Sequence, residues 1–172
     1  MKKILTLALV LALAVTGLSG CSGSGGTTPS KSPEELAQLY DTAITENGGE
    51  MVEYNPVITE KKEDDGSAML LEMLGLDTGD MTAFGISASM MNVQAYGIAA
   101  VMPAEGKADA VKEGLQGYID NQKAGFEMYL ADQYEVAKNA RLETLEDGTI
   151  LMVMCQDQDT VFDAISAAIQ AG

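Results

Sequence analysis

The 172-residue sequence contains no histidine and no tryptophan. Histidine is the usual general base near neutral pH and the commonest zinc ligand, so its absence excludes Ser-His-Asp and Cys-His catalysis. The few aromatic residues, six tyrosines and three phenylalanines, are scattered along the chain. This distribution argues against an aromatic platform on which sugars or bases would stack.

Positive charge and cysteine are also scarce. Ten Lys and Arg residues stand against 26 Asp and Glu residues, a formal net charge of −16. Such a charge opposes binding to nucleic acid or to an anionic membrane surface, because both are polyanions. The only cysteines are Cys21 and Cys155, and an intramolecular disulfide is excluded if Cys21 is consumed by another reaction.

The N-terminus carries the three-part pattern of an export signal. Lys2 and Lys3 precede the apolar run from Ile4 to Leu18, which is too short for the roughly 20 residues of a membrane-spanning helix. The segment Leu18-Ser19-Gly20-Cys21 follows it and resembles the lipobox of bacterial lipoproteins. That resemblance implies cleavage before Cys21 and attachment of a diacylglyceryl group to its sulfur, with the fatty acyl (palmitate) chains holding the protein at the cell membrane.

Three regions follow from this pattern. Residues 1–20 are predicted to be the lipoprotein signal peptide and residues 21–31 a flexible Gly/Ser/Thr linker. Removal of Lys2 and Lys3 with the signal would change the net charge from −16 to −18. Residues 32–172 are predicted to form a single domain, which is long enough to bury a core.

The first half of this domain is predicted to begin with a helix at Ser32. Ser32, Pro33 and Glu35 match a capping box with proline at the first helical position, and Asn47-Gly48-Gly49 is a stop signal. Residues 51–58 are predicted to be irregular because Pro56 disfavours a central strand, and residues 60–66 form a charged surface loop. A short helix is predicted over residues 67–75, with four apolar side chains turned inward: Met69, Leu70, Met73 and Leu74.

Residues 81–104 contain no charged side chain, yet their pattern predicts a β-hairpin rather than a membrane span. Phe84, Ile86, Ala88 and Met90 alternate with smaller or polar residues, which is typical of a strand with one buried face. The second strand is predicted over residues 95–102, with Tyr96, Ile98, Ala100 and Met102 on one face.

The second half repeats this order of elements. A long helix is predicted from Pro103 to at least Tyr129, with a stop at Asn139. Strands are predicted over residues 141–145 and 149–156, the latter apolar on both faces and therefore central, and a helix over 160–171. The predicted fold class is α+β: an N-terminal helix, then a β-β-α-β-β-α unit forming a four-stranded antiparallel sheet with helices packed on one face.

Three acidic motifs are candidates for chemistry. Asp77-Thr78-Gly79 is the tripeptide of aspartic proteases, but one copy supplies only one of the two carboxylates they need, and a turn is predicted instead. Asp157 and Asp159 suit a divalent cation, although they directly precede a helix and are predicted to cap it. Glu60, Glu63, Asp64 and Asp65 offer further calcium ligands in a loop that Lys61 and Lys62 partly neutralise.

Sulfur ligands are the other candidate. The methionines from Met69 to Met154, with Cys155, are the soft ligands that Cu(I) prefers. Most of these methionines lie on predicted apolar faces, so core packing is expected. Cys155 has no histidine or basic neighbour to lower its pKa and is predicted to be a small buried side chain. No catalytic residue, cofactor site or metal site is therefore assigned, and Cys21 is the one residue with an expected covalent role.

The segment from Phe84 to Gln170 resembles a domain of unknown function (family number 4358) that Gram-positive bacterial lipoproteins carry at their C-terminus. The matching residues are the strands 86–90, 98–102 and 151–155, the stretch Tyr129 to Tyr134, and Lys138-Asn139-Ala140. The resemblance implies a fold and supplies no catalytic residues.

The expected protein is a lipid-anchored, extracytoplasmic, non-enzymatic binding module. It is expected to bind a protein or another envelope component, and no nucleic acid. A small solute- or metal-ion-binding lipoprotein is the alternative. A hydrolase comes third, because histidine is absent.

Overall fold

The computed structural model describes residues 31–62 and 65–172. The predicted signal peptide, Cys21 and nearly all of the predicted linker lie outside the described residues. The described chain forms a four-stranded antiparallel sheet in the order β1-β2-β4-β3 together with helices, which confirms the α+β class. The strands are β1 (Met81–Ala88), β2 (Gly97–Pro103), β3 (Arg141–Thr144) and β4 (Ile150–Met154).

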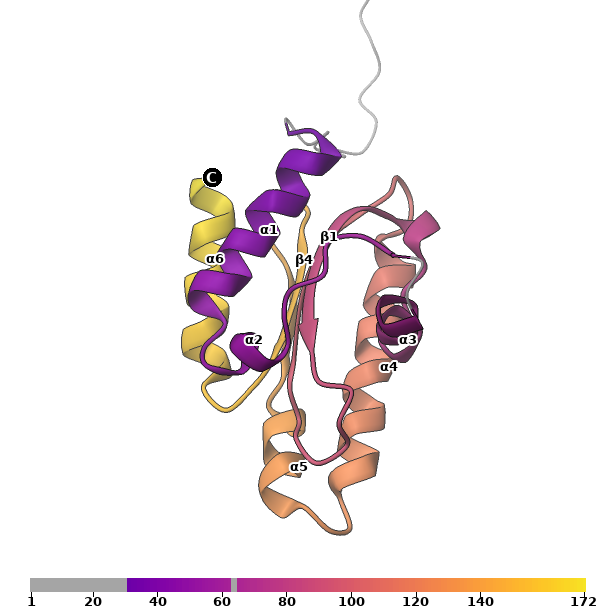
Figure 1. The fold of residues 1–172 in the computed structure, drawn as a ribbon, viewed down its shortest axis with the longest axis vertical. Helices are drawn as coiled ribbons and strands as arrows, with labels where there is room; N and C mark the ends of the chain where they lie inside the picture. Colours follow the sequence, from indigo (N-terminus) through magenta and orange to yellow (C-terminus); the bar gives the residue numbers. More distant parts are fainter. Residues whose placement is uncertain (1–30, 63–64) are drawn as a thin grey trace, which may run out of the picture.

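The helices lie on both faces of this sheet (Figure 1). On one face lie α1 and α6; on the other lie α3 and α4, with α5 at the end of that layer. The bounds are α1 (Pro33–Asn47), α2 (Met51–Tyr54), α3 (Asp65–Met73), the 3-10 turn η1 (Thr78–Asp80), α4 (Ala108–Phe126), α5 (Ala131–Lys138) and α6 (Gln158–Ala171). The prediction that helices cover one face only is wrong.

The register of the first hairpin explains why both faces are covered. Ile86 pairs with Ala99, and both side chains enter the core beneath α3 and α4. Ile98 pairs with Ser87 on the opposite face, beneath α1 and α6. Both faces of this hairpin therefore carry large apolar side chains, such as Ile86 on one face and Ile98 on the other, and each face needs its own helices to exclude water.

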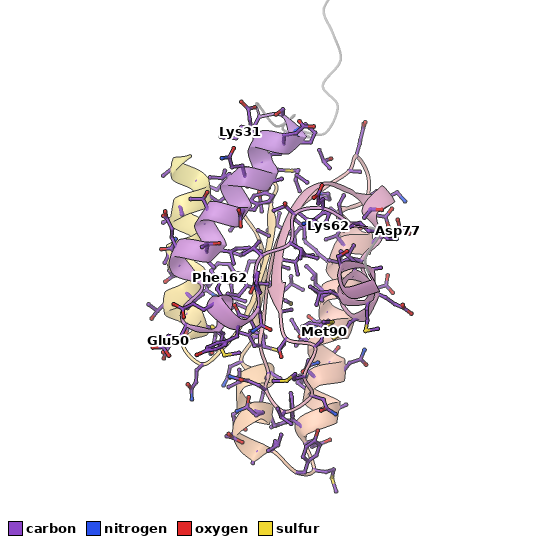
Figure 2. The ribbon with its side chains drawn as sticks, viewed as in Figure 1. Lys31, Glu50, Lys62, Asp77, Met90 and Phe162 are labelled. Atoms are coloured by element: carbon purple, nitrogen blue, oxygen red, sulfur yellow. The ribbon has the colours of Figure 1, made fainter. Side chains whose placement is uncertain are left out.

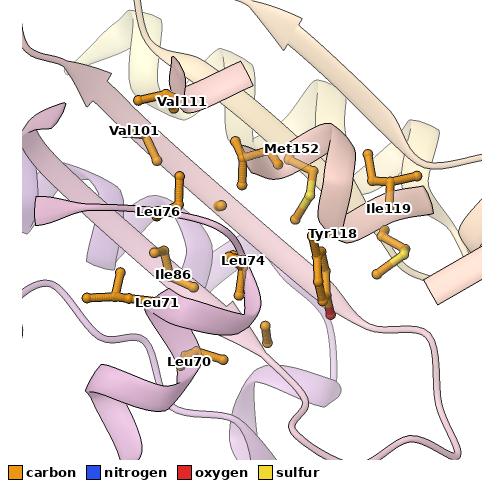
Figure 3. Close-up of a cluster of buried hydrophobic side chains, with 14 of the residues drawn as sticks. Leu70, Leu71, Leu74, Leu76, Ile86, Val101, Val111, Tyr118, Ile119 and Met152 are labelled. Carbon is orange, nitrogen blue, oxygen red and sulfur yellow. The ribbon is translucent and has the colours of Figure 1, made fainter. Parts of the chain in front are cut away.

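One core is formed by α3, α4 and the sheet (Figure 3). Leu70, Leu71 and Leu74 pack with Ile86 and Val101, and α4 adds Val111, Tyr118 and Ile119. The sequence places Met69 in this core, but its side chain is 58% exposed and Leu71 is buried instead. Helix α3 begins at Asp65, earlier than predicted, and presents Leu70 and Leu71 to the sheet, with Leu74 following directly after its end.

The second core is formed by α1, α6 and the sheet. Helix α1 has the predicted capping box, in which Ser32 accepts from the Glu35 amide and Glu35 accepts from the Ser32 amide. Tyr40 crosses β1 at Gly85, where a Cβ atom would lie 2.7 Å from the Tyr40 Cβ. The buried Tyr40 hydroxyl hydrogen-bonds the Thr149 hydroxyl at 2.8 Å, so α1 is tied to the second hairpin.

Two further helix predictions are corrected. Pro103 belongs to β2, and the predicted long helix is divided into α4 and α5, with a break over residues 127–130. Residues 51–54 form the short helix α2 rather than irregular chain, whereas Asn139 ends α5 as predicted. Within the described ranges, no helix combines the length and the apolar character needed to cross a bilayer.

Candidate interaction surface

Five large apolar side chains are exposed at one end of the domain. Met90, Met91 and Val93 lie on the β1–β2 loop, and Met128 and Tyr129 lie on the α4–α5 turn. Their exposed fractions run from 56% for Met90 to 89% for Met128. We call these five residues the distal surface. Isolated exposed apolar residues are ordinary, but five on two adjoining segments are a candidate contact surface.

Hydrogen bonds hold the two segments together. The Tyr129 hydroxyl donates to the Asn92 carbonyl at 3.2 Å, and the Ala95 amide donates to Gln133 Oε1 at 2.9 Å. On the other side, the Gln94 amide donates to Met51 Sδ on α2 at 3.2 Å. The loop is thus fixed between the α4–α5 segment and α2 although it carries no charged residue.

The distal surface lies far from the start of the described chain. Lys31 lies at one end of the long axis in Figure 2, and the α4–α5 turn lies at the opposite end in Figure 1. The Met90 and Glu50 labels fall in the half of the molecule away from Lys31.

An open pocket of about 450 Å³ adjoins the distal surface, and we call it the distal pocket. Met51, Tyr54 and Gln94 contribute to its wall, as do Cys155 and Tyr96. Burial raises the pKa of the Cys155 thiol to about 11, so this sulfur stays protonated at neutral pH. The pocket also has two carboxylates, those of Glu50 and Asp157, in its lining.

Acidic side chains lie on the segments next to the distal surface. Glu50 directly precedes α2, Glu53 lies on α2, Glu127 directly precedes Met128, and Asp132 lies on α5; all four are exposed. Hydrogen bonds from Gln133 lower the pKa of Asp132, which keeps it ionised. In the described part of the chain none of the four forms an ion pair. We call these four residues the acidic rim.

The lysines at this end are already paired. Lys123 contacts Asp120 at 3.3 Å, and Lys138 contacts Glu135 at 3.1 Å. They therefore offset Asp120 and Glu135 and leave the acidic rim uncompensated.

Asp77 lies in a turn, as predicted. Its Oδ1 accepts from the Gly79 amide at 2.7 Å and organises η1 between α3 and β1. The carboxylate is thereby used locally in an exposed turn, which is a structural role.

Asp157 and Asp159 were predicted to cap α6, but neither carboxylate makes a capping hydrogen bond in the structure. Asp157 occupies the N-cap position. Asp159 lies 3.4 Å from Arg141, whose guanidinium also contacts Asp163 at 2.9 Å and Glu143 at 2.8 Å. The same guanidinium lies 3.8 Å from the centre of the Phe162 ring. The cation that Asp159 meets is thus an internal arginine that ties β3 to α6.

The charged loop over residues 60–66, considered as a calcium site and predicted to be a solvated surface loop, is described only in part. Glu60 lies 3.8 Å from Lys62, while Glu63, Asp64 and the side chain of Asp65 lie outside the described residues. Over the described ranges no three potential metal-ligating side chains of His, Cys, Asp or Glu come together.

The methionines differ in burial. Met81, Met102, Met152 and Met154 are buried, which confirms core packing for them, and Met73 is partly buried against the same core as Met152. Met69, Met90, Met91 and Met128 are exposed. Met154 and Cys155 enter cores on opposite faces of the sheet, so these two sulfurs cannot meet one ion. Cys155 is buried, as predicted.

The distal surface was missed by sequence reasoning because of two misplaced element ends. Strand β1 ends at Ala88, so Met90 leaves the alternating pattern, and α4 ends at Phe126, so Tyr129 leaves the helical one. The available signal was Met-Met-Asn-Val at positions 90–93, an apolar segment in a predicted turn.

The fold and this surface define a small α+β domain with a patch of exposed apolar side chains on two adjoining segments. A family model described as Domain of unknown function (DUF4358) matches residues 56–155, and the chain belongs to that family. The match includes every residue of the distal surface. No curated protein and no solved structure matches the chain.

Proposed function

We propose that the protein is a lipid-anchored, extracytoplasmic, non-enzymatic binding module that engages an envelope protein through its distal surface. The observation that carries this proposal is the position of that surface. It lies in the half of the domain away from Lys31, with the α4–α5 turn at the far end, and Lys31 is the residue through which the chain continues towards Cys21. A lipid on Cys21 would therefore leave the distal surface directed away from the anchor.

The chemistry of the distal surface supports a protein partner. Burial of large exposed apolar groups is favourable by roughly 25 cal/mol per Å² of apolar surface removed from water. Methionine adapts its shape to a partner because its side chain is unbranched, and tyrosine adds contact area with a polar end. The hydrogen bond that Tyr129 donates to Asn92 and the one that Gln133 accepts from Ala95 hold the surface in place before binding, which lowers the entropic cost of association.

The anchor is tested by replacing Cys21 with serine. Wild-type protein is expected in the membrane fraction and labelled by palmitate, whereas Cys21→Ser should lose the label and leave that fraction. Cys155→Ser is the control and should behave as wild type. Membrane retention and labelling of Cys21→Ser would contradict a lipid anchor at this residue.

The binding role is tested by photo-crosslinking in intact cells. A photoreactive residue is placed at Met91, at Met128 or, as a control, at the exposed Gln38 of α1. One partner should be captured from both distal positions and not from Gln38. Met91→Ser together with Tyr129→Ser should then reduce native co-purification of that partner. Identical capture at all three positions, or capture at none, would contradict the proposal.

The distal pocket keeps a small-solute receptor as the second candidate. Its volume falls within the roughly 300–1,000 Å³ of small-molecule sites. A native-state ligand raises the melting temperature, so thermal shifts with calcium, copper and metabolites test this candidate. A shift that Tyr54→Ala abolishes would favour it over protein binding.

A further inference from the structure

We infer that the distal surface binds a cationic amphipathic segment of a partner polypeptide, with the partner's apolar stripe on the methionines and its Lys or Arg side chains against the acidic rim. This inference rests on the proposed function and names the chemistry of the partner.

The first step is the arrangement of apolar and charged groups. Met90, Met91 and Val93 form an uncharged loop beside Met128 and Tyr129. The loop contacts α2 through Gln94 and α5 through Ala95, and the acidic rim lies on or next to α2, α5 and the α4–α5 turn. An apolar centre with an acidic border fits a segment that is apolar along one stripe and positive along its flanks.

The second step is that charge disfavours the other occupants. A second copy would bring its own acidic rim against the first, and the net charge of −16 opposes such pairing. Anionic lipid headgroups and nucleic acid would meet the same repulsion. A partner that carries positive charge is the occupant whose charge complements the rim.

The third step is the distal pocket beside the surface. Tyr54 and Met51 offer apolar wall, and Glu50 and Asp157 offer two carboxylates in the same lining. A lysine or arginine buries its methylene stem on apolar surface while its charged head meets an anion or an aromatic face. The pocket is therefore a place for one basic side chain of the partner.

The experiment uses the mature full-length protein in nanodiscs of zwitterionic phosphatidylcholine, with empty nanodiscs as blank. The probe is a fluorescent peptide of leucine and lysine, about 18 residues and roughly five helical turns, with leucine at i, i+3, i+4 spacing. Two comparison peptides are used: a scrambled isomer without the stripe, and a glutamate-for-lysine version. Fluorescence anisotropy should show binding of the amphipathic cationic peptide and at least about tenfold weaker binding of both others.

Matched variants separate a local rim from general charge. The rim variant combines Glu50→Gln, Glu53→Gln, Glu127→Gln and Asp132→Asn. The control variant makes four changes at exposed glutamates elsewhere: Glu34→Gln, Glu72→Gln, Glu105→Gln and Glu146→Gln. Both lose four negative charges, yet the rim variant should weaken binding about tenfold and the control variant less than about twofold. Equal weakening would show attraction by net charge alone and overturn the inference.

The remaining outcomes are also decisive. Equal binding of the amphipathic and scrambled peptides would overturn the inference. So would binding to phosphatidylglycerol vesicles, or concentration-dependent dimer formation, if Met91→Ser abolishes either one. Absence of peptide binding with intact capture at Met91 and Met128 would overturn this inference and leave the proposed function standing. Absence of both would overturn the two together.

Discussion

Gly114 and Gly117 lie one turn apart on α4 and have different surroundings. A Cβ atom at Gly114 would overlap the Gly75 carbonyl, because α4 passes closely over the C-terminal end of α3 at this point. A Cβ atom at Gly117 would have no heavy atom within 4 Å. One glycine therefore permits a close approach of two backbones, and the other does not.

The pair yields a prediction with an internal control. Gly117→Ala should raise the free energy of unfolding by about 1 kcal/mol, because alanine favours a helix over glycine by that amount. Gly114→Ala should lower it by about 2 kcal/mol, because overpacking against a rigid backbone outweighs the helix preference. Urea unfolding of both variants measures the difference, and equal shifts of the two would contradict the close approach at Gly114.

Cys155 gives a pH-dependent prediction. Its native pKa is about 11, above the roughly 8.5 of an unfolded thiol. The native state therefore holds the proton more tightly, and this contribution to stability is full below about pH 8.5 and is lost as pH rises towards 11. Unfolding free energies measured between about pH 8 and pH 10 should fall less in Cys155→Ala than in wild type. Parallel pH profiles would argue that the thiol is not protected by burial.

At the scale of elements, the β1–β2 loop depends on a side chain from α5. The buried Ala95 amide has Gln133 Oε1 as its acceptor at 2.9 Å. A buried donor without an acceptor costs roughly 1–3 kcal/mol.

Gln133→Ala should therefore speed hydrogen exchange at the Ala95 amide by about one to two orders of magnitude. The control is Gln116→Ala on α4, where the glutamine side chain donates to the exposed Asp120 within the same helix. Unchanged protection of Ala95 in Gln133→Ala would show that the loop is held by other contacts.

The sequence predicts most elements because their apolar periodicity is strong. The capping box at Ser32 and the apolar run Ile150 to Cys155 led to a correct helix and a correct central strand. Element ends were less predictable, since the break after Phe126 has no proline and no strong stop signal. The distal surface depends on two such ends, and so it emerges only from the structure.

The two covered faces were missed for a different physical reason. Gly85 and Ser87 look like the outward positions of a half-exposed strand, yet both are buried under α1 or α2. Gly85 gives room to Tyr40, and the Ser87 hydroxyl donates to the Asn55 carbonyl at 2.6 Å. In a single sequence, a strand whose alternate residues are small looks like a strand whose alternate residues are exposed. Only the position of the strand in the folded sheet shows that these small residues are buried.

For the whole molecule, the central strands join the two cores. Leu151 and Met152 are adjacent on β4, and both are fully buried, one in each core. Because one strand supplies both cores, neither layer of helices has a sheet of its own.

Leu151→Ala and Met152→Ala should therefore each lower global stability, by about 2–5 kcal/mol. Amides of α1 and α4 should lose hydrogen-exchange protection equally in both variants, as in a single cooperative unit. Loss confined to α1 in Leu151→Ala, or to α4 in Met152→Ala, would indicate two separately unfolding layers.

The two sheet edges have a consequence for copies held close together. On the β1 edge, Ile86 exchanges two backbone hydrogen bonds with Ile58, at 2.8 and 2.9 Å. The β3 edge is only four residues long and carries Arg141 and Glu143. Free strand edges recruit neighbouring chains, and short, charged or bridged edges prevent this. With the proposed lipid anchor, copies of this domain would diffuse in two dimensions and meet one another often, and the blunted edges would prevent strand-to-strand aggregation between them.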